Sequence, residues 1–397
     1  MAAEENPWTS RLGILVMTHV AGTISIVSVL AMAPVITHDL SLSAAQFGFF
    51  VTTYYGAQSV ISIPAGGLVD RVGVGKSLVI CHVIMIVGAL LFSQAGSFEA
   101  ALVALAVMGM GYSISNPATA RGVLEWFPQE RRATAMGIKQ VGVPLGGMLG
   151  AANGALVTAV AWGDIMAGVA VLIFMNGVVC LKLVRLPATG VHQKGQRLLA
   201  NIREVMKDRN INRLTFINGC YNFGQTNFFA FLTLFLREVA QASQPMASLG
   251  IGIAQAASAI GRIGWGVVSD TIFNGRRKGL TVGMGAASVV GLVAMVMVGP
   301  GHGVLLGLGL ALVLGVSIAS FAPLLQTLSV ESSEPRLAGS TLGYTIFGTQ
   351  FGGMIGPPIF GAIVDASGGY GAGWLVTAAV MVTGTLILAF GFKERNR

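Results

Sequence analysis

The chain of 397 residues is 54% hydrophobic, carries charged side chains at only 10% of its positions, and has a mean hydropathy of +0.75. Soluble domains carry roughly 25% charged residues, so this composition excludes an ordinary soluble protein and indicates a membrane protein. The net charge of +8 does not indicate nucleic-acid binding, because the Lys and Arg residues cluster in short loops between apolar runs.

Apolar runs follow one another along the whole chain. A helix needs about 20 apolar residues to cross a bilayer. We count twelve such runs, at residues 11–36, 44–68, 77–95, 99–122, 134–160, 163–184, 211–237, 246–269, 279–299, 303–326, 338–364 and 370–392. The sequence therefore predicts an all-α membrane protein with twelve transmembrane helices in two six-helix bundles, residues 1–184 and 211–397, joined by a basic linker at 185–210.

Positive charge marks one side of the predicted membrane protein. The loops on that side and the tail contain Arg71, Lys76, Arg131, Arg132, the linker, Arg276, Arg277, Lys278, Arg336 and 393–397, whereas the opposite loops contain only Arg237. By the positive-inside rule we expect a multi-pass protein of a bacterial inner membrane with both termini in the cytoplasm. The acidic start, MAAEENPW, lacks the basic residues of a cleaved signal peptide.

The stretch VGVGKSL at Val72–Leu78 contains a Gly-Lys-Ser and invites comparison with a phosphate-binding loop. The Walker signature needs a glycine five positions before Gly75, but Asp70 stands there and would repel a phosphate. The cysteines Cys81, Cys180 and Cys220 lie in apolar runs without zinc-ligand spacing. We therefore expect no cofactor and no metal.

Two segments of the first half return in the second half. GGLVDRVGVGK at Gly66–Lys76 corresponds to WGVVSDTIFNGRRK at Trp265–Lys278, and each copy has an acid, Asp70 or Asp270, before a basic turn. AMGIKQVGVPLGGMLG at Ala135–Gly150 corresponds to TLGYTIFGTQFGGMIG at Thr341–Gly356. Matching signals at matching places indicate a duplicated six-helix unit, which is a common build for transporters. The paired glycines are expected to be close-packing residues.

The G-x-x-x-D-R-x-G pattern after the second helix, repeated in part after the eighth, resembles the loop signature of the major facilitator superfamily. That resemblance implies gating roles for Asp70, Arg71, Arg121 and Asp270, which would hold one side closed while the halves rock. Thr271 stands where the second copy usually has an arginine, so a weaker latch is expected there. The alternative is that these charges only set the topology.

Arg262 is a cation at bilayer depth, where charges are costly and usually functional. It lies eight residues before Asp270, about 12 Å inside the predicted helix and near the midplane. Its place resembles that of the helix-8 arginine in oxalate/formate and monocarboxylate transporters, which implies contact with a substrate carboxylate. The alternative is an arginine that snorkels or binds backbone carbonyls.

Two more ionisable residues lie inside predicted helices. Lys139, about 8 Å inside the fifth helix, is either a second anion contact or a snorkelling lysine. Its surroundings resemble, loosely, the fifth helix of cyanate- and nitrate-type facilitators. His19, about 12 Å inside the first helix, is a proton carrier, a substrate ligand or a hydrogen-bonded packing residue. No Asp or Glu lies at mid-depth in any predicted helix.

Polar residues form a stripe on the seventh predicted helix. Asn218, Tyr221, Asn222 and Gln225 are spaced i, i+3, i+4 and i+7, so they share one face and either line a water-filled cavity or bond neighbouring helices. Further substrate-binding candidates at similar depth are Tyr54, Gln58, Tyr112, Asn116, Tyr344 and Gln350.

The sequence thus predicts a secondary transporter of a small organic anion, with a carboxylate as the first choice, working by rocker-switch alternating access as a monomer in the bilayer. Protons or a counter-anion are the expected co-substrates, so proton symport and anion exchange both stay open. Proton-coupled drug efflux is a rival, but the fifth helix reads GVPLGG, with its proline displaced from the antiporter pattern. A membrane sensor or scaffold is another alternative, but it would need a soluble output domain, and no stretch outside the predicted helices is long enough to form one. We expect no enzyme activity, since no G-x-S-x-G or H-E-x-x-H motif occurs.

Overall fold

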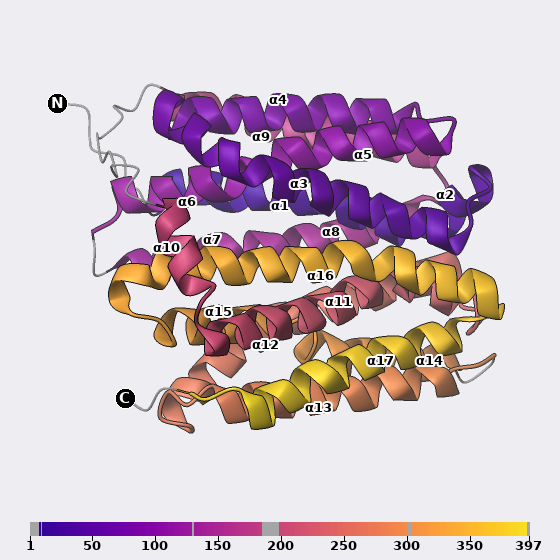
Figure 1. Ribbon diagram of the computed structural model, residues 1–397. Coiled ribbons are helices and arrows are strands. Elements are labelled where there is room, and N and C mark those ends of the chain that lie inside the picture. The colour runs from indigo at the N-terminus through magenta and orange to yellow at the C-terminus, as the bar shows by residue number, and fades with distance from the viewer. Residues whose placement is uncertain (1–7, 9, 129–130, 185–197, 301–302, 395–397) are drawn as a thin grey trace. The chain divides into compact units, whose positions relative to one another are not determined.

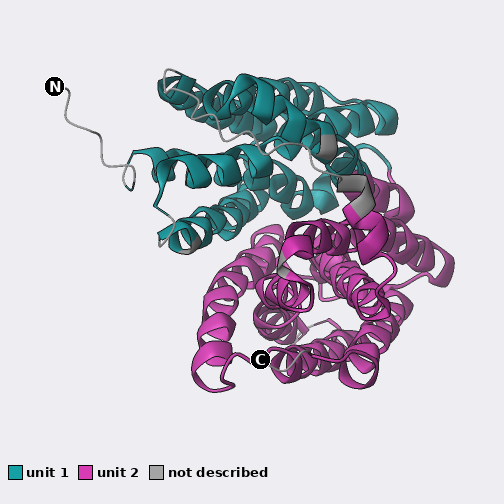
Figure 2. Cartoon of the chain, turned by 60° about the vertical axis from the view of Figure 1, so that its left-hand side comes forward, with its two compact units in different colours: residues 1–41, 53–193 teal, residues 42–52, 194–397 magenta. Residues whose placement is uncertain are grey.

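The computed structural model describes residues 8, 10–128, 131–184, 198–300 and 303–394, which form helices joined by short turns, with no β-strand among them (Figure 1). The chain divides into two compact units, residues 1–41 with 53–193 and residues 42–52 with 194–397 (Figure 2). Of the predicted linker, residues 185–197 lie outside the described residues, and a short helix follows at Leu198–Val205.

Unit 1 and the start of unit 2 share one long helix. The helices from the N-terminus to the linker are α1 (Arg11–Ala31), α2 (Ala33–Asp39), α3 (Ala44–Val72), α4 (Val74–Ser93), α5 (Phe98–Ser113), α6 (Ser115–Trp126), α7 (Arg132–Gln140), α8 (Gly142–Leu156) and α9 (Trp162–Val184). Residues 42–52, which include the beginning of α3, group with unit 2, and the rest of that helix groups with unit 1.

Unit 2 contains the remaining helices. They are α10 (Leu198–Val205), α11 (Arg209–Glu238), α12 (Gln244–Thr271), α13 (Lys278–Ala294), η2 (Met295–Met297), α14 (Gly303–Val316), α15 (Ala322–Glu331), η3 (Pro335–Leu337), α16 (Ala338–Ser367), α17 (Tyr370–Leu386) and η4 (Ile387–Gly391). Each of the twelve predicted runs is occupied by one helix or by two consecutive ones, so the all-helical expectation is confirmed.

Four of the predicted runs are broken into two α-helices, and each of these four breaks has the same physical cause. A proline stands within the first three residues of the second helix, at Pro34, Pro117, Pro144 and Pro323. Proline lacks an N–H and its ring clashes with the carbonyl four residues earlier, so it fits the first turn of a new helix better than the interior of a continuous one. The rule is not absolute, because Pro64 and Pro357 lie inside continuous helices.

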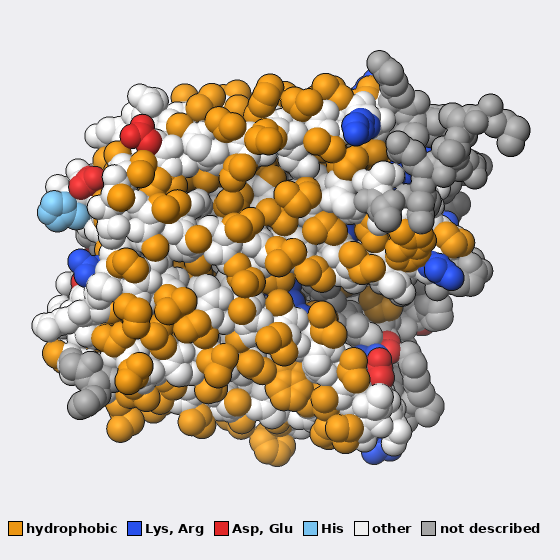
Figure 3. Space-filling model, turned by 180° about the vertical axis from the view of Figure 1, so that it is seen from behind, with side chains coloured by type: hydrophobic (Ala, Val, Ile, Leu, Met, Phe, Trp, Pro, Cys, Tyr) orange, Lys and Arg blue, Asp and Glu red, His pale blue; other side chains and the backbone are white. Residues whose placement is uncertain are grey.

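Seven helical segments in the described part of the chain are long and apolar enough to cross a membrane. They are Arg11–Ala31, Val74–Ser93, Phe98–Trp126, Trp162–Val184, Gln244–Thr271, Lys278–Met297 and Tyr370–Gly391. The surface agrees with that composition. On the face shown in Figure 3, hydrophobic side chains are spread over most of the surface, and most of the charged side chains lie toward its left and right margins. This distribution suits a protein whose solvent is lipid.

Glycines at a spacing of four hold α1 of unit 1 and α11 of unit 2 each against a later helix of the same unit. In unit 1, a methyl group added at Gly142, Gly146 or Gly150 of α8 would overlap the backbone or Cβ atoms of α1. In unit 2, Gly348, Gly352 and Gly356 of α16 meet α11 in the same way. The close-packing role expected for glycines in this repeat is therefore confirmed, and both units use it at corresponding positions.

Candidate functional site

A cluster of buried polar side chains lies in unit 1, around the hydroxyl of Thr119 on α6. Lys139 Nζ, at the end of α7, donates to Thr119 Oγ1 at 3.1 Å, and His19 Nε2, on α1, lies 3.1 Å from the same oxygen. His19 Nδ1 lies 3.3 Å from Tyr112 Oη on α5. The exposed fractions are 0% for His19 and Thr119, 3% for Lys139 and 8% for Tyr112. Four helices therefore bring three predicted site residues, and one unpredicted one, into a single network.

Glycines and helix breaks make room for this cluster. Gly22 of α1 lies against the ring of Tyr112, where any larger side chain would overlap the ring, and its carbonyl accepts a hydrogen bond from Tyr54 Oη at 3.1 Å. Gly142, the first residue of α8, lets that helix approach α1 beside His19. Because α7 ends at Gln140, the chain places Lys139 next to this close approach.

Lys139 has no anionic partner among the described residues. None of the ion pairs in that part of the chain includes its ammonium group, and its hydrogen-bond partner, Thr119, is neutral. Removing an ammonium ion from water costs several kcal/mol when no counter-charge compensates it. A buried lysine in these surroundings can therefore gain free energy by binding an anion.

Arg262 of unit 2 lies in a second polar cluster, around the carbonyl of Ala319 in the turn between α14 and α15. Its Nη2 donates to that carbonyl at 3.3 Å and its Nε donates to Ser258 Oγ at 3.2 Å. Ser258 Oγ and Gln225 Nε2 donate to the same carbonyl, at 2.8 and 3.0 Å. Arg262 is half-buried. Two predicted residues, Arg262 and Gln225, thus meet at a backbone oxygen that the sequence did not single out.

The polar stripe of α11 reaches α13, α16 and, through Gln225, the turn between α14 and α15. Tyr221 Oη donates to the Thr281 carbonyl of α13 at 3.0 Å. Asn222 Nδ2 donates to the Thr349 carbonyl of α16 at 2.8 Å, and Thr349 Oγ1 lies 3.4 Å from Asn218 Oδ1. These are interhelical hydrogen bonds of the kind the alternative interpretation expected. A cavity lined by this stripe stays a prediction.

The remaining candidates have varied surroundings. Tyr344 Oη donates to Asn212 Oδ1 at 3.0 Å, and Gln58 is buried with no hydrogen-bond partner for its Oε1 among the described residues. Asn116 is exposed, Gln350 is half-buried, and Tyr54 is fully buried against α1. None of these contacts assigns a role, so the five residues stay candidates.

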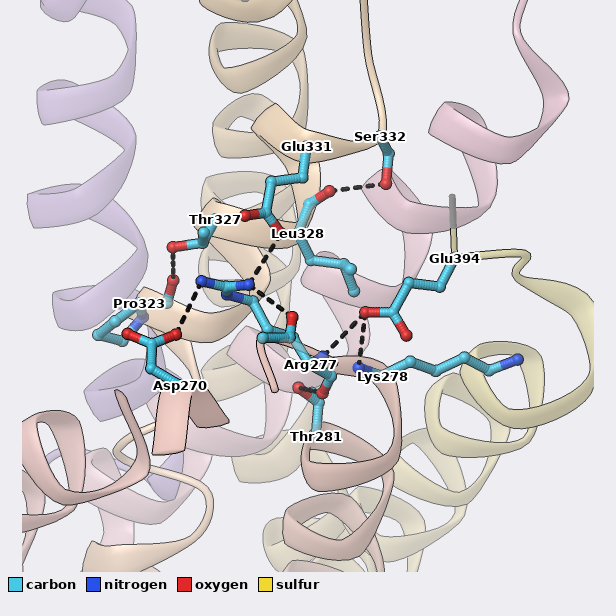
Figure 4. A network of polar contacts seen from close by, with 11 residues as sticks. Asp270, Arg277, Lys278, Thr281, Pro323, Thr327, Leu328, Glu331, Ser332 and Glu394 are labelled. Carbon is cyan, nitrogen blue, oxygen red and sulfur yellow. Dashed lines mark hydrogen bonds and ion pairs between the residues drawn. The ribbon is translucent and has the colours of Figure 1, made fainter. Parts of the chain in front are cut away.

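The two acids of the repeated loop each pair with an arginine. In unit 1, Arg121 of α6 donates to Asp70 Oδ1 and to Glu125 Oε1, both at 2.6 Å. In unit 2, Arg277 donates to Asp270 Oδ1 at 3.2 Å and to Glu331 Oε2 at 3.0 Å (Figure 4). Arg71 is exposed. The second copy, which has Thr271 after its acid, obtains its guanidinium from the start of α13.

The C-terminal segment joins this network in unit 2. Glu394 Oε1 accepts hydrogen bonds from the backbone N–H groups of Arg277 at 2.8 Å and Lys278 at 3.3 Å (Figure 4). Lys278 Nζ donates to the Phe392 carbonyl at 2.8 Å. The free N–H groups at the start of α13 thus donate to a carboxylate, and its negative charge also interacts favourably with the positive end of the helix dipole.

The sequence matches the model of the Major Facilitator Superfamily over residues 14–349 and again over 214–397. The chain belongs to that superfamily. The folded chain is also similar to the nucleoside transporter NupG, with a TM-score of 0.80 and 15% identity over 96% of this chain and all of that one (100%). A likeness at this identity concerns the fold, which is the all-helical fold of the superfamily.

Two curated relatives extend over nearly the whole chain. The probable sulfoacetate transporter SauU of Cupriavidus necator is 25% identical over 96% of this chain and 92% of its own length. A hexuronate transporter of Bacillus subtilis is 23% identical over 95% of this chain and 93% of its own length. This superfamily member is therefore a multi-pass membrane transporter and not an enzyme, and relatives of it are named for organic anions.

Several residues of these clusters were missed by sequence reasoning. They are Thr119, Glu125, Ser258, Ala319, Arg277 and Glu331. Thr119 had a usable signal, since it follows the predicted Tyr112 and Asn116 by seven and three residues, the spacing of one helical face. Ala319 had none, because its contribution is a carbonyl oxygen that any residue carries.

Proposed function

We propose that this chain is a secondary active transporter of small organic anions, most simply carboxylates, and that Lys139 binds the anionic group. The observation that carries this proposal is the buried ammonium of Lys139, which has a neutral hydroxyl as its partner and no ion pair in the described part of the chain. An ammonium group has three donors, so two stay available for a substrate.

The names of the relatives support an anionic substrate. Sulfoacetate and hexuronates are small organic anions, and the transporters named for them align with more than nine-tenths of this chain. Arg262 is proposed as a second anion contact, since a guanidinium presents a planar fork that matches a carboxylate. Gln225 lies beside it on the Ala319 carbonyl.

The proposed cycle is rocker-switch alternating access by a monomer of a bacterial inner membrane with both termini in the cytoplasm. Proton symport or exchange against a counter-anion would drive it. An inside-negative potential opposes anion entry by about 2.3 kcal/mol per charge per 100 mV, so uptake of a monoanion needs one of these couplings. Asp70, Arg71, Arg121 and Asp270 are proposed as gating residues.

A binding screen with lysine variants tests the proposal. Purified wild-type protein, Lys139→Ala and the control Lys182→Ala, which changes an exposed lysine of α9, are incubated with sulfoacetate, galacturonate, acetate, nitrate, cyanate and cationic drugs. At least one anion should raise the melting temperature of the wild type and the control. Lys139→Ala should bind that anion about tenfold or more weakly, because it lacks one charge-assisted hydrogen bond worth roughly 1.5–3 kcal/mol.

Two results would contradict the proposal. Unchanged anion affinity in Lys139→Ala would make Lys139 a snorkelling residue with no part in binding. Stabilisation of the wild type by cationic drugs alone would place the chain among the efflux proteins, the rival that the sequence left open.

A further inference from the structure

One hydroxyl connects the two ionisable residues of the unit 1 cluster. Thr119 Oγ1 lies 2.7 Å from the Ser115 carbonyl and 3.2 Å from the Asn116 carbonyl, in addition to its contacts with Lys139 and His19. We infer that Thr119 is a positioning residue of the anion site, whose hydroxyl fixes the direction of the Lys139 ammonium and the tautomer of His19. The inference rests on the proposed function, because Lys139 matters here as the anion contact.

The chemistry of the four partners decides how the hydroxyl is used. A threonine hydroxyl has one hydrogen and two acceptor lone pairs. Backbone carbonyls only accept, so the hydrogen points to Ser115, which is the shorter contact. An ammonium only donates, so Lys139 takes one lone pair. The second lone pair is left for His19 Nε2, which must therefore carry a hydrogen.

This assignment leaves each group with a defined task. With Nε2–H bound to Thr119, His19 turns Nδ1 toward Tyr112 Oη. Lys139 donates one N–H to Thr119 and has two N–H groups left to donate to an anion. Because Thr119 is fully buried and its hydroxyl is bound to its own helix, the oxygen cannot rotate away from the two side chains. The ammonium is thereby held in place before the anion arrives, which lowers the entropic cost of binding.

Two substitutions separate the hydroxyl from the shape of the residue. Thr119→Val keeps the branched side chain and removes the hydroxyl, whereas Thr119→Ser keeps the hydroxyl and its bond to the Ser115 carbonyl. Thr18→Val is the matched control. Thr18 is also 0% exposed and its hydroxyl donates to the Ile14 carbonyl at 3.0 Å, on α1.

The anion that gives the largest stabilisation in the screen, with sulfoacetate as the first probe, is titrated into all variants by calorimetry. We expect Kd to rise about tenfold in Thr119→Val and to stay within about threefold in Thr119→Ser and Thr18→Val. Wild-type affinity in Thr119→Val, together with weakened binding in Lys139→Ala, would overturn the positioning role and leave the proposed function standing. Unchanged affinity in Lys139→Ala would instead overturn the function on which the inference rests.

Nitrogen-15 NMR of histidine-labelled wild-type protein gives a readout that needs no Thr119 variant. The spectrum at neutral pH distinguishes protonated from unprotonated ring nitrogens, and the difference from His19→Gln assigns the signals. A protonated Nε2 supports the role of Thr119. A neutral ring with its hydrogen on Nδ1 would overturn it, because both Nε2 and Thr119 Oγ1 would then lack a hydrogen for their contact.

Discussion

Arg277 donates to the carboxylate of Asp270, seven residues earlier, and so completes in unit 2 an acid–arginine–acid chain that unit 1 builds with an arginine from a different element. Glu125 and Glu331 correspond, since each lies eight residues after the proline of its helix, Pro117 or Pro323. At the position of Arg121, unit 2 has Thr327 (Figure 4). Unit 2 therefore keeps the acid–arginine–acid arrangement of unit 1. Its arginine, however, lies at the start of α13 and not on α15, the helix that corresponds to α6.

Arg277→Gln should slow transport while leaving anion affinity within about twofold, because the pair lies in the loop network and not in either polar cluster. The expected slowing is roughly twofold to tenfold, equivalent to about 0.4–1.4 kcal/mol in the barrier. Uptake rate and equilibrium Kd are measured side by side with Asp70→Asn, which should behave alike, and with Arg276→Gln, which removes an exposed charge from the same turn. A large loss of equilibrium binding in folded Arg277→Gln protein would contradict a gating role.

Gly352→Ala should destabilise unit 2 by about 1–3 kcal/mol, because its methyl group would overlap the backbone of Gly219 on α11 and backbone atoms cannot yield as a side-chain end can. Gly343→Ala lies on the same helix, α16, and meets nothing within 4 Å, so it serves as the control. Thermal unfolding of the two purified variants checks this. Equal melting temperatures would show that α11 and α16 are not in close contact at Gly352.

The pH dependence of α10 follows from one ion pair. Hydrogen bonds from Arg336 hold the pKa of Glu204 below its ordinary value. A depressed carboxyl pKa adds stability above the unfolded-state pKa, and that stability is lost as the pH falls through the folded-state pKa. Amide exchange in 198–205 should therefore be faster in Glu204→Gln than in the wild type at pH 7, and equal in the two at a pH below that of carboxyl titration. Equal exchange in the two proteins at both pH values would mean that the Glu204–Arg336 ion pair does not stabilise α10.

The sequence predicted the helices well and their interruptions poorly. Hydropathy reports composition averaged over a window, so it found every run, but a proline that starts a second helix changes the local geometry without changing the average. The breaks matter because the one between α7 and α8 places Lys139 at a helix end beside α1. Similarly, the spacing of Asn218, Tyr221 and Asn222 correctly put them on one helix, but a stripe is wide enough to reach α13 and α16 at once.

The contacts between the site residues were harder to predict from the sequence than the residues themselves. His19 and Lys139 were recognised because ionisable side chains are rare at bilayer depth. Nothing in their sequence positions, 120 residues apart, indicates that both contact Thr119, because that relation depends on how α1, α6 and α7 pack. Arg277 was read as a topology signal for the same reason, since its pairing with Asp270 depends on the turn that joins α12 to α13.

His19→Ala should abolish proton-driven accumulation of the anion and spare exchange of external for internal substrate. An imidazole can accept and release a proton, and no Asp or Glu lies at mid-depth in the predicted helices, so the sequence offers His19 as a carrier of the coupling proton. Proteoliposomes with and without a pH gradient separate the two modes, and His38→Ala, at an exposed histidine, is the control. If His19→Ala still accumulates anion on a pH gradient, His19 is a packing residue and the coupling proton travels by another route.

Arg262→Lys should weaken anion binding nearly as much as Arg262→Ala. The guanidinium reaches Ser258 and Ala319 with two different nitrogens, and a lysine has a single nitrogen that cannot hold both contacts and still present a fork to a carboxylate. Loss of one or two charge-assisted hydrogen bonds, each worth roughly 1.5–3 kcal/mol, predicts at least about tenfold weaker binding in both variants. The best anion from the screen is titrated and its uptake is measured, with Arg276→Lys as the exposed control. Normal binding and transport by Arg262→Lys would contradict bidentate binding of the carboxylate by the guanidinium. It would show that a positive charge at this position is sufficient. Improved efflux of cations by Arg262→Ala would move the protein to the drug-export class, because removing a positive charge helps a cationic substrate and harms an anionic one.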